Sequence, residues 1–176
     1  MEKEDNVKNF KYKVAALYKF LSIIDQDILM IKDELTNLAT NQEIKGTILI
    51  ASEGVNGTVC GTENAISLFI ERLKKLLKIN DINVKYSWTD KQAFRRFKAR
   101  KKKEIVTIGL QQINPSKSVG KYIKASEWND FLKGPDTVVI DTRNEYEIKI
   151  GTFAGALNPH TSSFREFPAW VQKYSK

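Results

Sequence analysis

The order of the apolar segments in the first half of the chain limits the folds that it can adopt. Four segments have the length and the apolar or alternating pattern of β-strands: 12–20, 46–52, 57–61 and 82–88. A longer segment with helical periodicity lies between the first and second of these, and another between the third and fourth. The resulting order β-α-β-β-α-β is that of the split βαβ, ferredoxin-like fold.

Both helices are predicted from apolar residues that recur at three- and four-residue steps. In the segment 25–40 the stripe consists of Ile28, Ile31, Leu35 and Leu38, behind a candidate cap at Asp25. In the segment 62–78 it consists of Ile66, Phe69, Ile70, Leu73, Leu76 and Leu77. Thr62 can cap this second helix, and Glu63 suits the positive end of its dipole.

The segment EGVNG (53–57) lies between the second and third strands. Asn56-Gly57 is a favoured dipeptide for a tight hairpin, which gives the segment a structural role. A loop with so few side chains can also let a substrate approach the backbone. Glu53, Gly54, Asn56 and Gly57 therefore form a candidate substrate loop, and the motif alone does not choose between the two roles.

Positive charge is concentrated in one stretch, KQAFRRFKARKKK (91–103), which we call the basic run. Its cations are Lys91, Arg95, Arg96, Lys98, Arg100, Lys101, Lys102 and Lys103, and they account for the whole net charge of +8. One concentrated patch on an otherwise neutral chain indicates a polyanionic partner. Nucleic acid is the favoured partner, because Phe94 and Phe97 are interleaved with the charges. A solvated surface and an anionic membrane surface are the alternatives.

The sequence gives no sign of a membrane span, a signal peptide, a disulfide, or a metal or cofactor site. No apolar run approaches the length of a membrane span, and the polar N-terminus does not resemble a signal peptide, so we expect a cytoplasmic protein without a membrane partner. Cys60 is the single cysteine and His160 the single histidine, which excludes a disulfide and a cysteine-based zinc cluster. We expect Cys60 to be buried in a strand. No metal site and no cofactor fingerprint is recognisable.

The second half of the chain begins with another strand candidate, 104–110, and a polar stretch with Pro and Gly, 111–122. A short helix is predicted at 126–133, a buried strand at 137–141, and a loop with a helical turn at 142–148. These elements are the opening of an α/β domain that cannot close its own sheet. We expect a domain at 1–112, a linker at 113–122 and an incomplete domain at 123–176.

Four blocks of the sequence, in order, resemble the rhodanese-domain tRNA uridine hydroxylases: ASEGVNGTVCG, FRRFKARKKKEIVTIGL, GKYIKASEWNDFL and VVIDTRNEYEIKIGTFAGALNPHTSSFREFPAWV. The resemblance covers essentially the whole chain. It implies an α+β protein with a ferredoxin-like N-terminal domain and the N-terminal part of a rhodanese-like domain. It also implies oxygen-dependent 5-hydroxylation of the wobble uridine of tRNA, with molecular oxygen as co-substrate and tRNA as partner.

The family's rhodanese domain continues to a loop with a cysteine, and no residue of this chain matches that cysteine. The resemblance therefore implies a C-terminally truncated chain that is inactive alone, from a truncated form or an interrupted gene, with a C-terminal rhodanese fragment as a conceivable complement. Asp141, Arg143 and Glu147 match the start of the domain, and such residues more often fix loops than perform chemistry. The alternatives are a noncatalytic RNA-binding module and, more weakly, a sulfurtransferase-related protein, for which a sulfur-carrying nucleophile is missing.

Overall fold

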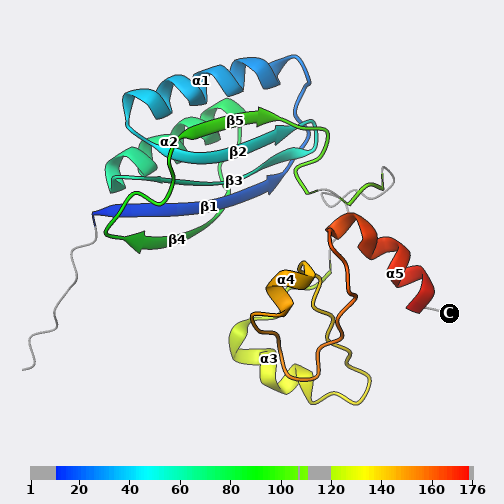
Figure 1. Ribbon diagram of the computed structural model, residues 1–176. Helices are drawn as coiled ribbons and strands as arrows, with labels where there is room; N and C mark the ends of the chain where they lie inside the picture. Colours follow the sequence, from blue (N-terminus) through cyan, green and yellow to red (C-terminus); the bar gives the residue numbers. More distant parts are fainter. Residues whose placement is uncertain (1–10, 107, 111–119, 175–176) are drawn as a thin grey trace, which may run out of the picture. The chain divides into compact units, whose positions relative to one another are not determined.

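We describe the chain from a computed structural model, which covers residues 11–106, 108–110 and 120–174 (Figure 1). The chain divides into two compact units, Met1–Val106 and Thr107–Lys176, which we call the first and second units and describe separately. Residues 113–119 of the predicted linker lie outside the described part. Among the described helices, none has the length and apolar character needed to cross a membrane.

The first unit contains a five-stranded sheet. Its strands are β1 (Tyr12–Phe20), β2 (Lys45–Ala51), β3 (Gly54–Gly61), β4 (Asn83–Thr89) and β5 (Phe97–Lys101). They lie in the order β4-β1-β3-β2-β5, and every neighbouring pair is antiparallel except β2 and β5, which are parallel. The first four strands have the ferredoxin-like order, which confirms the fold predicted for this part of the chain.

Two helices, α1 (Asp27–Asn41) and α2 (Glu63–Leu77), lie on the same face of this sheet (Figure 1). Their predicted stripes pack against alternate strand residues and are buried, except that Leu38 and Leu76 are partly buried. Phe69, Leu35 and Leu17 are among the largest buried side chains. Thr62 caps α2 as predicted, because its hydroxyl accepts the Ala65 N–H at 3.3 Å. The predicted cap of α1 at Asp25 is wrong: the N-cap is Gln26, and its side chain makes no capping bond.

The turn between β2 and β3 lies earlier than the Asn56-Gly57 dipeptide suggested. Ala51 pairs with Gly54, so the turn consists of residues 52–53, and Asn56 and Gly57 lie inside β3. Gly54 has a φ of +142°, and a Cβ atom there would lie 2.0 Å from the carbonyl oxygen of Lys19. This glycine is therefore required by the close approach of β1.

The last strand of the first unit also differs from the prediction. Residues 97–101 of the basic run form β5, whereas the described residues of the predicted strand 104–110 belong to no strand. The reason is visible in the alternation of the run. Phe97 and Ala99 are apolar and separated by one cation, so one face of the segment can join the core while Lys98 and Arg100 point to the other face.

The second unit contains α3 (Ala125–Leu132), α4 (Glu145–Ile148), η1 (Phe164–Glu166) and α5 (Phe167–Tyr174). The strand predicted at 137–141 is wrong: the described residues there make one isolated parallel bridge, Ile140 to Leu157. Val138 is 56% exposed, so this segment lacks the neighbours that a buried strand needs. The rhodanese-like character of this unit stays a prediction.

Candidate nucleic-acid interface

The central part of the basic run is an edge strand whose side chains alternate between the two faces of the sheet. On the helix-covered face, the Phe97 ring lies edge-on to that of Phe69, with the ring centres 5.9 Å apart. Lys101 lies on this face too, and its Nζ is 2.6 Å from a carboxylate oxygen of Asp25. Lys98 and Arg100 project from the other face, which no helix of the first unit covers (Figure 1).

The cations beside β5 are close enough to repel one another. The Arg96 guanidinium lowers the pKa of Lys98 below its ordinary value, and desolvation and Arg100 lower it further. Lys98 is half-buried, and the other cations of the basic run are exposed: Lys91, Arg95, Arg96, Arg100, Lys101, Lys102 and Lys103. A bound anion would relieve this repulsion, so the strand has the electrostatics of a phosphate-binding edge.

The two aromatic residues of the run are not equivalent. Phe97 lies in β5 and packs against the hydrophobic core. Phe94 lies in the connection before β5 and is half-buried. Phe97 is therefore an anchor for β5 and is not available for stacking on a base.

The candidate substrate loop is occupied by contacts within the chain. A Glu53 carboxylate oxygen accepts the Ile105 N–H at 2.6 Å, and the Asn56 side-chain amide donates to the Ile105 carbonyl at 3.0 Å. Ile105 is 3% exposed, and buried backbone groups need hydrogen-bond partners. These two side chains supply the partners for its N–H and its carbonyl. Gly57 has no room for a side chain, because a Cβ atom would lie 2.2 Å from the Thr47 carbonyl oxygen. The segment holds the chain that follows the basic run, and its substrate role stays a prediction.

Cys60 lies in β3 and is fully buried, as predicted. A buried thiol of this kind is usually inert. Among the described residues, no group of three or more His, Cys, Asp or Glu side chains is placed to hold a metal ion.

In the second unit, Asp141 and Arg143 form a bidentate ion pair. Arg143 donates from Nε and Nη2 to the two carboxylate oxygens at 3.0 and 2.6 Å, and Thr152 donates to the same carboxylate at 2.8 Å. The hydrogen bonds from Arg143 and then from Thr152 hold the pKa of Asp141 well below its usual range. Arg143 also donates to the Gly151 carbonyl. These contacts tie residues 141–152 together.

Glu147 has a related function at the start of α4. Its carboxylate accepts the Asn144 N–H at 3.2 Å, which completes a capping box at the N-terminus of this short helix. Glu147 therefore acts on the backbone of its own loop.

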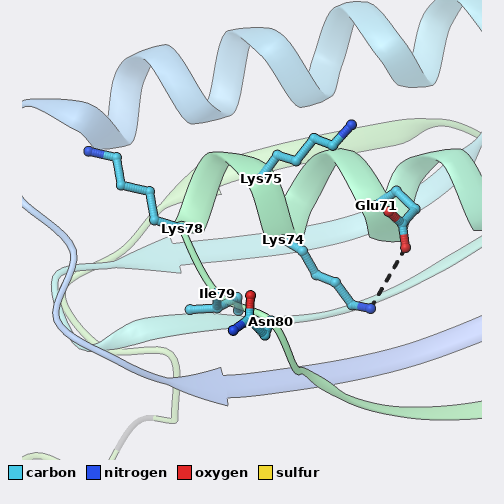
Figure 2. Close-up of a pocket in the computed structure, with 6 residues that line it drawn as sticks. All are labelled: Glu71, Lys74, Lys75, Lys78, Ile79 and Asn80. Carbon is cyan, nitrogen blue, oxygen red and sulfur yellow. Dashed lines mark ion pairs between the residues drawn. The ribbon is translucent and has the colours of Figure 1, made fainter.

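A second group of lysines lies at the C-terminal end of α2, beside a surface pocket (Figure 2). Lys74, Lys75 and Lys78 point in different directions, and Lys74 forms an ion pair with Glu71 at 3.8 Å. Cations at this end complement the negative end of the helix dipole. Because their ammonium groups diverge, these lysines do not form a common anion site.

Residues 12–105, from the start of β1 to Ile105, match the model of the UPF0176 acylphosphatase-like domain. The chain belongs to this family. The match ends at the residue that Glu53 and Asn56 hold, so those two contacts close the UPF0176 domain.

Curated relatives extend the comparison beyond the UPF0176 domain. A tRNA uridine(34) hydroxylase of Prochlorococcus marinus (strain NATL1A) is 79% identical over 176 residues, 100% of this chain and 55% of that protein. The protein of the same name in strain MIT 9303 is 48% identical over 170 residues, 97% of this chain and 55% of that protein. The protein of that name in Synechococcus sp. (strain CC9605) is 48% identical over 164 residues, which are 90% of this chain and 50% of that protein.

These relatives confirm the resemblance to tRNA uridine hydroxylases, and the chain spans about half the length of each.

One feature of the UPF0176 domain was missed in the sequence. None of its five strands contains Asp or Glu, whereas the basic residues Lys13, Lys19, Lys45, Lys85, Lys98, Arg100 and Lys101 all lie in strands. The acidic residues that the structure describes in this unit lie in helices and connections. The predicted strands 12–20, 46–52, 57–61 and 82–88 already show this segregation, because they contain Lys13, Lys19 and Lys85 and no acidic residue.

Proposed function

We propose that this chain takes part in the oxygen-dependent 5-hydroxylation of uridine 34 of tRNA, and that its first unit binds the tRNA. The observation that carries the proposal is the 79% identity, across the whole chain, to a protein named tRNA uridine(34) hydroxylase. At that level of identity the residues that contact a shared substrate are expected to be largely shared. The exposed cations of the basic run supply the charge that a tRNA backbone requires.

The role of the basic run in this proposal is to position the tRNA. Contacts to phosphates carry no sequence information and fix the register of the nucleic acid on the protein. Because β5 is hydrogen-bonded to β2 and anchored by Phe97, its cations are held on a rigid strand. A rigid strand loses less conformational entropy on binding than a flexible basic tail.

The proposal extends to the second unit and to the reaction. Residues 123–176 form the N-terminal part of a rhodanese-like domain, a C-terminal rhodanese fragment complements it, and molecular oxygen is the co-substrate. We propose that the chain acts in the cytoplasm. Cys60 is buried in β3, so the thiol of this chain is not placed for sulfur transfer or for chemistry on uridine. We therefore expect the 176-residue chain to bind tRNA but to lack hydroxylase activity by itself.

The test is tRNA binding by fluorescence anisotropy across a salt series. If about half of the cations in the run meet phosphates, the slope of log affinity against log salt is about −3 to −4. In the variant with Arg95, Arg96, Arg100 and Lys102 changed to Gln, we expect the slope to flatten by about 3. The affinity for every tRNA should fall to a similar degree.

The matched control changes four lysines on the helices, Lys32, Lys74, Lys75 and Lys78, to Gln. It removes the same charge from the other side of the unit and should alter the slope by less than about 1. Equal effects in the two variants would show that tRNA responds only to net charge. Absence of tRNA binding by the parent chain would contradict the proposed function.

A further inference from the structure

The sheet of the first unit has one face that its helices leave uncovered. Alternation places Ala15, Leu17 and Ile48 toward the helices and their neighbours in the strands toward the other side. We call this second side the open face. The strand residues on it include Val14, Ala16, Tyr18, Thr47, Leu49, Asn56, Thr58, Lys85, Ser87, Lys98 and Arg100. Part of this face is covered at Asn56, whose side chain holds the buried Ile105.

The middle of the open face is a floor of small side chains. Ala16 is exposed although it lies in β1, with strands paired on both sides. Around it, Thr58 lies opposite Ala16 in β3, and Thr47 lies opposite Thr58 in β2. The side chains of this floor therefore carry both methyl and hydroxyl groups, which can contact the flat surface of a base and hydrogen-bond to its edges.

Cations lie at both edges of this floor. Lys98 and Arg100 project from β5 at one edge, and Lys85, which pairs with Ala16, projects from β4 at the other. Four strand spacings separate β4 from β5, or about 19 Å. No strand of the sheet contributes an acidic residue, so all charged side chains that the strands place on the open face are positive.

We propose that the open face binds an unpaired stretch of RNA that crosses the strands from β5 to β4, with phosphates at Lys98, Arg100 and Lys85 and bases on the floor around Ala16. Bases can reach such a floor only where they are not paired, since a duplex encloses them. This inference rests on the proposed function, which makes tRNA the partner. It adds that the surface extends well beyond the basic run, to β1 and β4.

The decisive variants lie outside the basic run. Ala16→Glu places a negative charge in the middle of the floor and should weaken binding of an unpaired RNA oligonucleotide by about tenfold, because like charges are expensive at an interface. Ala16→Gln introduces a side chain of nearly the same size as glutamate but without its charge, and it should weaken binding by less than about threefold. Because Ala16 is exposed and faces Lys85, the acidic side chain can be accommodated in the folded sheet.

Charge at the far edge is tested by Lys85→Gln, with Lys78→Gln as its control at the end of α2. Lys85→Gln should reduce the magnitude of the salt slope by about 0.7 to 0.9, and Lys78→Gln should leave it unchanged. The same titrations are repeated with a fully paired RNA of equal length, which we expect to bind more weakly and to respond little to Ala16→Glu.

The outcomes separate this inference from the proposed function. One outcome is that the parent chain binds tRNA and that the four-Gln variant of the basic run weakens this binding, whereas Ala16→Glu and Lys85→Gln do not. In that case the open face is not the RNA surface, and the proposed function stands. If the paired RNA binds as tightly as the unpaired one and is equally sensitive to Ala16→Glu, the preference for unpaired RNA is wrong. If the parent binds no RNA, both proposals fail together.

Discussion

The contacts that hold Ile105 predict a loss of stability when Glu53 is removed. Glu53→Ala leaves the Ile105 N–H, now bonded at 2.6 Å, without an acceptor at a position that is 3% exposed. A hydrogen bond to a charged group is worth about 1.5 to 3 kcal/mol, and we expect a loss of about 2 kcal/mol in the free energy of unfolding. Asn56→Ala removes a neutral bond to the Ile105 carbonyl and should cost about 1 kcal/mol.

The assay is thermal and urea unfolding of the first unit, followed by circular dichroism. Since about 1 kcal/mol shifts the melting temperature of a domain of this size by roughly 4 to 8 °C, Glu53→Ala should lower it by about 10 °C. Glu53→Gln keeps an oxygen acceptor and should recover about half of the loss. The double variant should cost less than the sum of the two single ones, because both side chains hold the same residue.

A different result would restore the substrate role of this segment. If Glu53→Gln leaves the free energy of unfolding unchanged while tRNA affinity falls more than tenfold, Glu53 contacts the substrate and its bond to Ile105 is incidental. The tRNA titration of the same protein sample distinguishes the two roles.

Three further results are expected. Phe97→Ala should cost about 2 to 3 kcal/mol of unfolding free energy without altering the tRNA salt slope, and a changed slope would mean that this ring meets RNA. Cys60→Ser should unfold at lower temperature and bind tRNA normally, whereas hydroxylase turnover that depends on Cys60 would refute its inert role. Because the pKa of Asp141 is lowered in the folded chain, its pairing with Arg143 stabilises the second unit above about pH 4 and is lost as pH falls further. Hydrogen exchange at the Asp141 amide from pH 7 to pH 3 measures this, and protection that does not fall with pH would contradict it.

The fold of the first unit was largely predictable because its signals are local. The bounds predicted for β1 match the structure, and those of both helices agree within two residues, since buried stripes such as Ile28 to Leu35 have one plausible period. The turn at residues 52–53 was not predictable from Asn56-Gly57, because Gly54 is required by Lys19 on a strand distant in sequence. Such tertiary requirements leave no local pattern.

The candidate site was predictable in its charge and not in its geometry. Residues 97–101 were recognised as basic, but nothing in their sequence indicates that β5 pairs in parallel with β2. The pairing decides which cations share a face, and it places Lys98 with Arg100 and Lys101 with Asp25. The position of Lys85 opposite Ala16 was not predictable, because β4 takes its place beside β1 only when the sheet forms.

The position of β5 at the margin of the sheet also bears on solubility. An edge strand exposes unpaired backbone groups that can join the sheet of another molecule, and lysine or arginine on such a strand opposes that joining. Two copies of this chain that approached through β5 would bring Lys98 and Arg100 of each against those of the other. The same cations therefore keep the sheet from extending between molecules. When a polyanion or a glutamine substitution neutralises them, this protection is lost, and self-association should increase with the degree of neutralisation.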